Sequence, residues 1–333
     1  MAICLSNCKD YSEQTTVLKL GHTLDTEHAV HKSMQYMSER LEHYSDGTMR
    51  LELYPNAQLG TERELVELLQ IGSLAMTKVS ASPLESFVPE MKIFSLPYVF
   101  RDNEHYWQVL NSEIGQKLLT SPKHARLRGL GYYDAGSRSF YTNDRPALSP
   151  DDLKGLKIRV MKSQTAVDLV NSLGAAATPI SWGELYTALQ QGVVDGAENN
   201  PPTFFRSRHY EISKYFVLDE HSSVPDILLM SEHIWSTLSE EQQAWLNAAM
   251  QDSIAFQREL WRQATEEALT AVAAAGVEII TPDKAPFAAA VKDMKAAYQG
   301  TDIGDLLNAI DAIGQPNAGP ATRPATDEGG TPL

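Results

Sequence analysis

The chain has 333 residues, and because 43% of them are hydrophobic it can build two separate cores, so two domains are expected. No apolar run approaches the roughly 20 residues needed to cross a bilayer, and the formal net charge of −15 argues against a nucleic-acid partner, which would require a basic face. An anionic small ligand would therefore need a local positive site that is sheltered from this overall charge.

The two ends of the chain differ from the rest. The only two cysteines are Cys4 and Cys8, so no disulfide can form within the folded body. The opening MAICLSNC has too short an apolar run for a secretory signal and lacks its basic residues, so residues 1–16 are interpreted as the end of an export leader, with Cys8 in an imperfect lipid-attachment box, or else as a disordered start. We prefer the first interpretation. Residues 314–333, rich in Pro, Gly, Ala and Thr, are expected to be a disordered tail.

The first part of the chain alternates strand and helix patterns, which favours a parallel or mixed sheet covered on both faces. Strands are predicted at 17–23, 49–53, 75–80 and 93–100, and helices at 30–46, 61–72 and 103–119. Thr61 and Glu64 predict a capping box at the start of the second helix. The strand at 75–80 ends in polar residues, among them Lys78 and Ser80.

Two extended segments are predicted to cross between the domains. The segment 127–141 is interrupted by Gly131 and Gly136, and the segment 215–231 carries Pro225 near its middle. Each domain is then discontinuous in sequence. Lobe I is expected at 17–137 plus 225–262, and lobe II at 138–224 plus 263–313.

A single long helix is predicted to follow, with Ser239 and Gln242 forming a capping box and Gly276 ending it. At about 1.5 Å per residue it could reach about 55 Å, more than the width of one domain, so we expect it to bridge both lobes. The strand 277–280 and two final helices are expected to return to lobe II. The predicted fold class is therefore α/β, with two lobes joined by crossing strands and a long bridging helix.

The stretch 154–202 places polar residues at the ends of its elements. Strands are predicted at 157–161, 177–180 and 193–197, and helices at 163–174 and 181–192, the second capped by Ser181 and Glu184. This order puts Arg159 and Trp182 near element ends, and Asn199 and Asn200 at the carboxyl end of the last strand. In open α/β sheets that edge is where ligands bind.

Each of these residues has a plain structural alternative. Arg159 is either a surface arginine at a strand end or a clamp whose guanidinium forms two parallel hydrogen bonds with a carboxylate, and Arg138 carries the same ambiguity. Trp182 is either a core residue or a flat platform for a sugar ring. Asn199 and Asn200 can either cap a loop or hydrogen-bond to hydroxyls.

Common catalytic and metal motifs are absent from the sequence. There is no G-x-G-x-x-G, P-loop, H-E-x-x-H or G-x-S-x-G motif, and His28 and His31 lack partners at metal-ligand spacing, so we expect no cofactor and no metal. His28 follows the first strand closely, so a contact with a ligand stays open. Glu184 is interpreted as structural, because its predicted capping role already accounts for it.

Several segments together resemble the solute-binding subunit of tripartite ATP-independent periplasmic (TRAP) transporters. The resembling segments are YPNAQLG (54–60), FSLPYVF (94–100), DDLKGLKIRV (151–160), ELYTALQQGVVDGAEN (184–199) and the long helix. The resemblance implies two α/β lobes that close over an organic acid, with Arg159 as the family's carboxylate-binding arginine. It also implies ligand contacts for Asn199, for Arg138 near the crossover and for Trp182.

Three further segments are similar to family members that take hexuronates such as glucuronate or galacturonate. They are KVSASPLESFVPEM (78–91), AENNPPTFFRSRHYE (197–211) and LDEHSSVPD (218–226). A uronate has one carboxylate and a ring of hydroxyls, and the resemblance implies that Lys78, Ser80, Asn200, Glu220 and His221 contact those hydroxyls.

The sequence therefore predicts a periplasmic binding protein, not an enzyme, that captures a sugar acid and delivers it to integral-membrane TRAP subunits. We expect it to act as a monomer, and a lipid anchor through Cys8 stays open as an alternative. Three alternatives stay open: another organic acid such as an aldonate or a C4-dicarboxylate, a sensor or another transporter type, and an enzyme that uses Glu184, Glu220 or His221 as acid or base.

Overall fold

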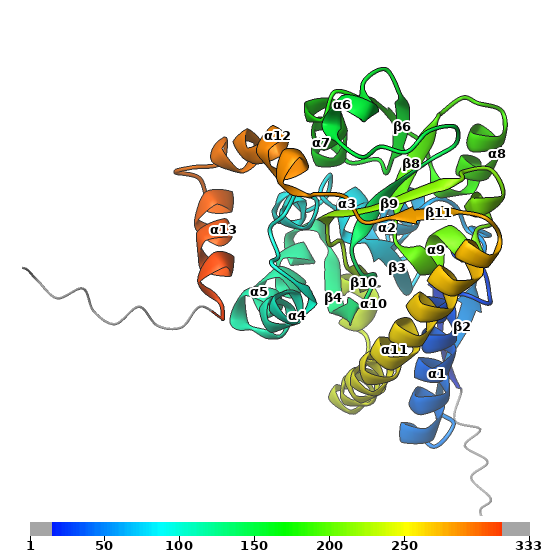
Figure 1. Ribbon diagram of the computed structural model, residues 1–333. Helices are drawn as coiled ribbons and strands as arrows, with labels where there is room; N and C mark the ends of the chain where they lie inside the picture. The colour runs from blue at the N-terminus through cyan, green and yellow to red at the C-terminus, as the bar shows by residue number, and fades with distance from the viewer. Residues whose placement is uncertain (1–14, 315–333) are drawn as a thin grey trace, which may run out of the picture.

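The structure, a computed structural model, describes residues 15–314, and in this range the chain folds into two lobes that each contain one β-sheet (Figure 1). The architecture is the predicted mixed α/β one. Cys4, Cys8 and the predicted tail beyond Gly314 lie outside the described residues. Within residues 15–314, no helix combines the length and the apolar character that a membrane span requires.

Lobe I is built on a five-stranded sheet with the order β2-β1-β3-β10-β4. Its strands are β1 (Thr16–Gly21), β2 (Met49–Tyr54), β3 (Met76–Ser80), β4 (Leu127–Tyr133) and β10 (Asp226–Ser231). Strands β1, β2 and β3 run parallel, and β10 is antiparallel to both β3 and β4. The carboxyl ends of the parallel strands therefore lie along one edge of the sheet, where β3 ends in Lys78 and Ser80.

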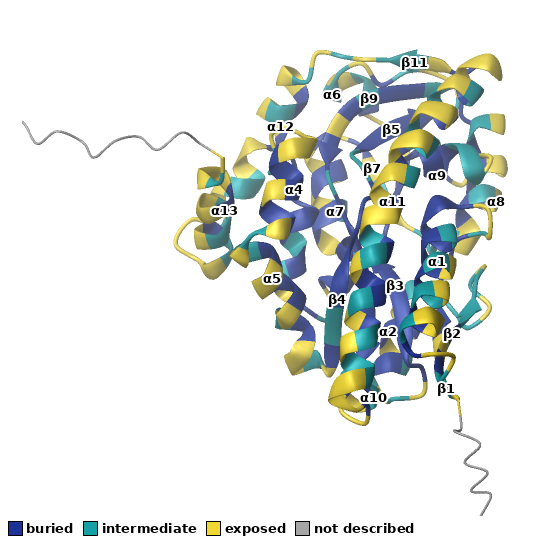
Figure 2. Cartoon of the chain, turned by 90° about the horizontal axis from the view of Figure 1, so that it is seen from below, coloured by how far each residue is buried: buried dark blue, intermediate teal, exposed yellow. Residues whose placement is uncertain are grey.

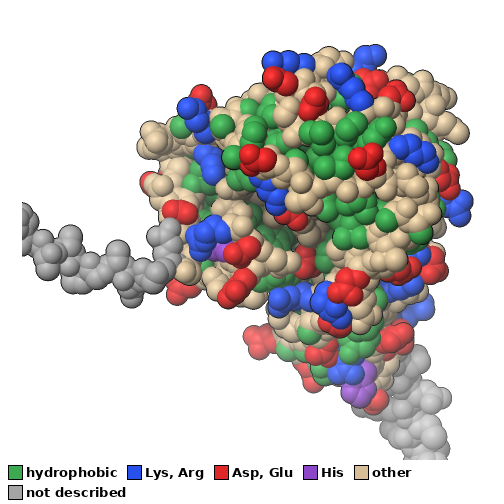
Figure 3. All heavy atoms as spheres, viewed as in Figure 1, with side chains coloured by type: hydrophobic (Ala, Val, Ile, Leu, Met, Phe, Trp, Pro, Cys, Tyr) green, Lys and Arg blue, Asp and Glu red, His purple; other side chains and the backbone are tan. Residues whose placement is uncertain are grey.

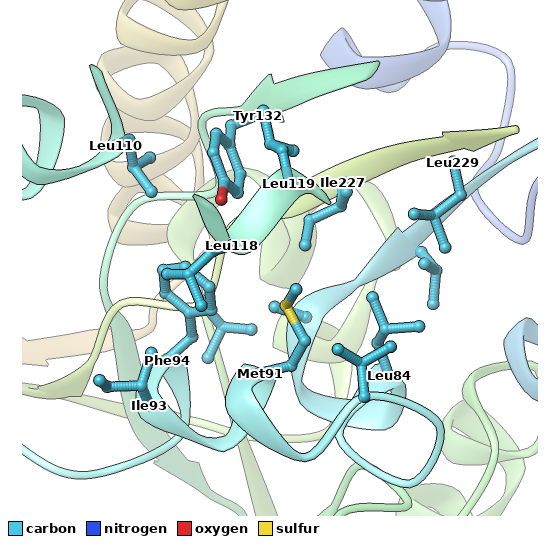
Figure 4. Close-up of a cluster of buried hydrophobic side chains, with 14 of the residues drawn as sticks. Leu84, Met91, Ile93, Phe94, Leu110, Leu118, Leu119, Tyr132, Ile227 and Leu229 are labelled. Carbon is cyan, nitrogen blue, oxygen red and sulfur yellow. The ribbon is translucent and has the colours of Figure 1, made fainter. Parts of the chain in front are cut away.

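Helices cover both faces of this sheet. They are α1 (Ala29–Tyr44), α2 (Glu62–Gln70), α3 (Ala81–Leu84), α4 (Asn103–Asn111), α5 (Glu113–Thr120) and α10 (Glu232–Trp235). On one face, Met91 and Phe94 pack with Tyr132 and Ile227 of the sheet (Figure 4). On the other face, a second cluster joins β1 and β2 to α1 and the long helix. The predicted capping box of Thr61 and Glu64 is present at the start of α2.

Lobe II is built on a six-stranded sheet with the order β11-β9-β5-β8-β6-β7. Its strands are β5 (Arg138–Thr142), β6 (Lys157–Val160), β7 (Ala176–Pro179), β8 (Gly196–Asn199), β9 (Tyr215–Ser222) and β11 (Glu278–Ile280). Its helices are α6 (Pro150–Leu153), α7 (Gln164–Ser172), α8 (Leu185–Gln190), α9 (Pro201–Arg206) and α12 (Ala285–Ala296). Separate apolar clusters fill its two faces, one under α7 and α12 and the other under α8 and α9. Figure 2 shows the buried strands and the exposed outer faces of the helices.

The two predicted crossings and the bridging helix are present. The chain passes from β4 in the first sheet to β5 in the second, and returns from β9 to β10 through Pro225. Helix α11 (Glu240–Ala274) begins at the predicted Ser239 capping box, and its Leu246 packs in the core of lobe I while Val272 packs in the core of lobe II (Figure 1). The structure thus contains the three connections between lobes that the sequence predicted, and the segment that follows α12 is a further one.

The prediction of a strand at 93–100 is wrong. Pro89–Phe94 forms a 3₁₀ helix, and Tyr98 adopts a left-handed backbone with φ 49° directly after Pro97, which has no N–H for a strand ladder. The apolar run predicted a strand because a short, fully buried segment is apolar on all sides. Such a run has no periodicity that distinguishes a strand from a helical turn. The single helix predicted at 103–119 is also divided, because Ser112 ends α4 and its hydroxyl caps Ile114 N at 3.2 Å at the start of α5.

Two further expectations differ from the structure. Ser181 and Glu184 form no capping box: Trp182–Glu184 is a 3₁₀ turn that leads into α8, and Glu184 is exposed. The last helix, α13 (Asp302–Ala312), packs on lobe I and not on lobe II, because Ile310 is buried in the lobe I cluster and its carbonyl lies 3.0 Å from His105 Nε2.

Candidate functional site

A cavity of about 390 Å³ lies between the two lobes and is lined by residues of both. Its lining includes the segment after β1, the ends of β3, β6 and β8, and the first residues of α2 and α9. Of the predicted site residues, the cavity brings together Arg159, Arg138, Asn199, Asn200, Trp182, Lys78, Ser80 and His28. This is the strand edge at which α/β sheets commonly bind ligands.

Arg159 lies in β6 and is 2% exposed, yet it has no carboxylate partner within the described residues. Its Nε donates to Ile180 O at 2.9 Å, whereas Nη1 is fully buried and makes no hydrogen bond to the described part of the protein. Burial lowers the pKa of the Arg159 guanidinium. Even so, arginine keeps its charge in proteins, so this site holds a buried cation with free donors.

Arg138 lies at the start of β5, and all three of its guanidinium nitrogens contact the neighbouring strand β8. Its Nη2 donates to Glu198 Oε1 at 3.0 Å and to Glu198 O at 2.7 Å, and its Nε contacts the other carboxylate oxygen of Glu198. Its Nη1 donates to Asn199 Oδ1 at 3.0 Å. The guanidinium is therefore neutralised by the protein and also fixes the side chain of Asn199.

His221 supports this pair from behind, away from the cavity. Its Nδ1 lies 2.8 Å from Asp219 Oδ2 and its Nε2 lies 3.7 Å from Glu198 Oε2, while its ring stacks on Phe140 at 4.4 Å. Burial opposes protonation, but Asp219 and Glu198 raise the pKa of His221 to about 9. Burial likewise opposes the ionisation of Glu198, but Arg138 and His221 lower the pKa of Glu198 to about 2. His221 and Glu198 therefore both carry their charge at neutral pH.

The two asparagines present donors, because the protein already uses their oxygens. Asn199 Oδ1 accepts from Arg138 and from Asn200 N at 2.9 Å, and Asn200 Oδ1 accepts from Thr203 N at 2.9 Å at the start of α9. Their Nδ2 groups have no hydrogen-bond partner in residues 15–314. Together with Arg159, they make the lobe II wall of the cavity a surface of hydrogen-bond donors.

The lobe I wall has the opposite character. Lys78 Nζ lies 3.2 Å from Glu62 Oε1 and 3.0 Å from Asp226 Oδ1. Ser80 donates to Asp226 Oδ1 through its hydroxyl at 2.8 Å and to Glu62 Oε1 through its backbone N–H at 3.1 Å. Burial opposes ionisation of Lys78, but Asp226 and Glu62 raise the pKa of its ammonium. Two carboxylates therefore surround one cation on this side.

His28 links the two walls. It caps α1 by accepting Val30 N at Nδ1 (3.2 Å), and its Nε2 lies 3.2 Å from Thr203 Oγ1 of lobe II. Burial lowers the pKa of His28 to about 4, so the ring is neutral, and with Nδ1 accepting, Nε2 carries the proton and donates to Thr203. Trp182 is a half-buried residue of the cavity lining, and its ring centre lies 5.8 Å from the Arg159 guanidinium carbon.

Two residues of the sequence prediction, Glu220 and His221, lie outside the cavity lining. Glu220 is exposed, adopts a left-handed backbone with φ 49°, and contacts Lys284 and Ser137 on the surface. The pairing of β5 with β9 shifts in register between Arg138 and Phe140. Because of this shift, strict alternation along β9 does not predict which side chains face the cavity. His221 acts on the cavity only through Glu198 and Arg138.

The sequence interpretation missed Glu62, Asp226, Thr203 and Trp261, which all line the cavity. Glu62 looks like an ordinary first-turn acid after the Thr61 cap, and Asp226 like a residue that follows a crossing proline. The two carboxylates meet only because β10 pairs with β3 in the folded sheet, and no local pattern carries that signal. Within the described residues, no group of three or more His, Cys, Asp or Glu side chains could hold a metal ion.

Comparisons with known proteins place this geometry among ligand-binding proteins. Residues 20–302 match the family model of bacterial extracellular solute-binding proteins, family 7. A relative from Salmonella typhimurium, the uncharacterized protein YiiZ, is 39% identical over 86% of this chain and 88% of its own length. The C4-dicarboxylate-binding periplasmic protein DctP of Rhodobacter capsulatus is 31% identical, and the match covers 78% of each chain.

Solved structures resemble the chain over most of its length. A TRAP periplasmic solute-binding protein from Bradyrhizobium sp. BTAi1, in complex with D-galacturonate, has 40% identity and a TM-score of 0.85 over 88% of this chain and 98% of its own. Another from Pseudomonas putida F1, with bound D-glucuronate, has 35% identity and a TM-score of 0.87 over 90% of this chain and 98% of its own.

Proposed function

Because the chain belongs to bacterial extracellular solute-binding protein family 7, whose similar solved structures are TRAP periplasmic binding proteins, we propose that it captures a sugar acid and delivers it to the membrane subunits of a TRAP transporter. The proposed ligand is a hexuronate, D-glucuronate or D-galacturonate. The place of action is the periplasm, in keeping with a family of extracellular binding proteins.

One observation carries the proposal: Arg159 is a buried guanidinium with no carboxylate partner in the described protein, and it faces a cavity between two lobes. A buried charge without a partner is costly, so a protein that keeps one has a use for it. A carboxylate matches the guanidinium with two parallel hydrogen bonds, and in a site closed to water these bonds count for more. The proposed role of Arg159 is therefore to pair with the carboxylate of the ligand.

The remaining lining suits a polyhydroxylated ring. Asn199 and Asn200 offer amide donors, Glu62 and Asp226 offer acceptors, and Trp182 offers a flat apolar face. The cavity volume of about 390 Å³ lies within the range of small-molecule sites and leaves room for one six-carbon acid with few waters. Arg138, which Glu198 already neutralises, is proposed to position Asn199 and to add a donor at the cavity edge.

Ligand capture is proposed to involve closure of the lobes. The two lobes also contact each other directly: Glu85 Oε1 of lobe I accepts Thr165 N at 3.0 Å at the start of α7, and His28 contacts Thr203. The two crossings and α11 allow rotation of one lobe against the other while both cores stay intact. Closing them around the ligand would remove the Arg159–carboxylate pair from water.

Calorimetric titration with matched acids and neutral sugars tests the proposal. D-Glucuronate and D-galacturonate are expected to bind saturably, whereas D-glucose and D-galactose, which carry CH₂OH in place of the carboxylate, are expected to show no binding at about 100-fold higher concentration. Equal binding of acid and neutral sugar, or no binding of any sugar acid, would contradict it. Mass spectrometry should recover the bound acid unchanged, and conversion to a product would favour the enzyme alternative.

A further inference from the structure

The largely buried part of the lobe I wall contains two carboxylates and only one ammonium. Glu62 and Asp226 both approach the single ammonium of Lys78, and the side chains of all three are 15% exposed or less. These three side chains, two acids and one base, lie opposite Arg159 in lobe II. Arg63 also lines the cavity, but it is half exposed and pairs with Glu67 on the surface.

The oxygen atoms of these carboxylates are used unequally. Glu62 Oε1 accepts Lys78 Nζ and Ser80 N, and Asp226 Oδ1 accepts Ser80 Oγ and contacts Lys78. The second oxygens, Glu62 Oε2 and Asp226 Oδ2, have no hydrogen-bond partner within residues 15–314, and both side chains line the cavity. Among these largely buried side chains, the unused groups of lobe II are donors and those of lobe I are acceptors.

This polarity distinguishes two kinds of organic acid. A hydroxyl group can donate to Glu62 Oε2 or Asp226 Oδ2 at little cost, because it carries no charge. A second carboxylate at the same place would meet two carboxylates and one ammonium that is already engaged, in a sheltered site where like charges repel strongly. Binding sites commonly discriminate between similar ligands by repelling the charge of the wrong one.

We propose that Glu62 and Asp226 are specificity-determining residues that read the hydroxyls of the ligand and exclude acids with a carboxylate at both ends. The inference rests on the proposed function, because it takes the first carboxylate to be held by Arg159. It assigns the ligand to monocarboxylic polyhydroxy acids and sets this chain apart from relatives named for C4-dicarboxylates.

The test compares D-galactonate with D-galactarate, two open-chain six-carbon acids that differ only in having CH₂OH or a second carboxylate at the far end. Each is used to displace D-galacturonate from the parent chain and from the variants Glu62→Gln and Asp226→Asn in competition calorimetry. Circular dichroism verifies folding, and Glu42→Gln is the matched control, since Glu42 is exposed in α1 of lobe I and does not line the cavity.

We expect the parent and the Glu42→Gln control to prefer galactonate by about 100-fold or more. Either amide variant should reduce that preference at least about tenfold by gaining affinity for galactarate. The inference is overturned if the parent binds both acids equally, or if the preference is the same in parent and both amide variants. Failure of D-galacturonate itself to bind the parent would instead contradict the proposed function.

Discussion

Two arginines of lobe II line the same cavity in different surroundings. Around Arg138, where β5 meets β8 and β9, the protein supplies Glu198, Asn199 and the supporting His221, so the charge is neutralised within the fold. Around Arg159, at the end of β6, the protein supplies one carbonyl and leaves a buried nitrogen unpaired. The charge of Arg138, which the protein neutralises, stabilises the fold. The charge of Arg159, which the described part of the protein leaves unpaired, indicates that a ligand supplies its partner.

If Arg138 neutralises a buried charge for the benefit of the fold, removing it should cause the largest loss of stability. Arg138→Met leaves the Glu198 carboxylate, 3% exposed, beside only His221, and breaking a buried ion pair typically costs about 3–5 kcal/mol. Urea unfolding followed by circular dichroism should show a loss of this size. Arg208→Met, which removes an exposed arginine paired with Glu211 at 3.9 Å, is the control and should change stability by under about 0.5 kcal/mol. A loss below about 1 kcal/mol for Arg138→Met would show that the pair does not support the fold.

The charged cluster behind Arg138 also predicts a pH dependence. Because Asp219 and Glu198 raise the pKa of folded His221 to about 9, its contribution to stability is complete below its unfolded value near 6.5 and is lost as pH rises through about 9. The pKa of folded Glu198 is lowered to about 2, so its contribution to stability is complete above its unfolded pKa of about 4.5 and is lost as pH falls towards 2. The stability difference between parent and His221→Asn should therefore shrink by on the order of 2 kcal/mol between pH 6.5 and 9. A difference that stays constant over this range would mean that His221 is neutral in the fold.

The smallest effect is expected at Trp182, which lies half-buried near Arg159 and packs partly on the second core of lobe II. Removing the ring in Trp182→Ala should weaken sugar-acid binding by about 1 kcal/mol, measured by calorimetry, because an aromatic face adds contact area but no charge. Trp182→Phe keeps a flat face and should recover most of the loss. If Trp182→Ala titrates like the parent, Trp182 belongs to the core and not to the ligand site.

The parts of the fold that depend on local signals could be predicted from the sequence. The capping boxes at Thr61 and Ser239 correctly predicted where two helices begin. The alternation of apolar and polar residues predicted most of the strands, and Pro225 within an extended segment indicated the second crossing. Arg159, Asn199 and Asn200 could be found because strand ends in α/β sheets converge on one edge. Ser181 failed as a cap because its segment forms a 3₁₀ turn.

Features that depend on distant pairings could not be predicted. Glu62 and Asp226 come together through the antiparallel pairing of β3 and β10, which joins segments 146 residues apart at Ser80 and Asp226. Glu220 points away from the cavity because of a local irregularity in β9. Helix α13 packs on lobe I through one apolar face. Any amphipathic helix has such a face, so the sequence of α13 does not indicate which lobe it packs against.

The central claim is that Arg159 keeps its charge for the carboxylate of the ligand, and a four-way titration tests it most directly. Parent and Arg159→Met are each titrated with D-glucuronate and with its neutral analogue D-glucuronamide. We expect the parent to bind the acid more tightly than the amide. Arg159→Met should lose about 2–5 kcal/mol of affinity for the acid and bind acid and amide equally. The free energy of unfolding of Arg159→Met, measured without ligand, should not be lower than that of the parent. An Arg159→Met variant that still prefers the acid by the parent's margin would contradict the account.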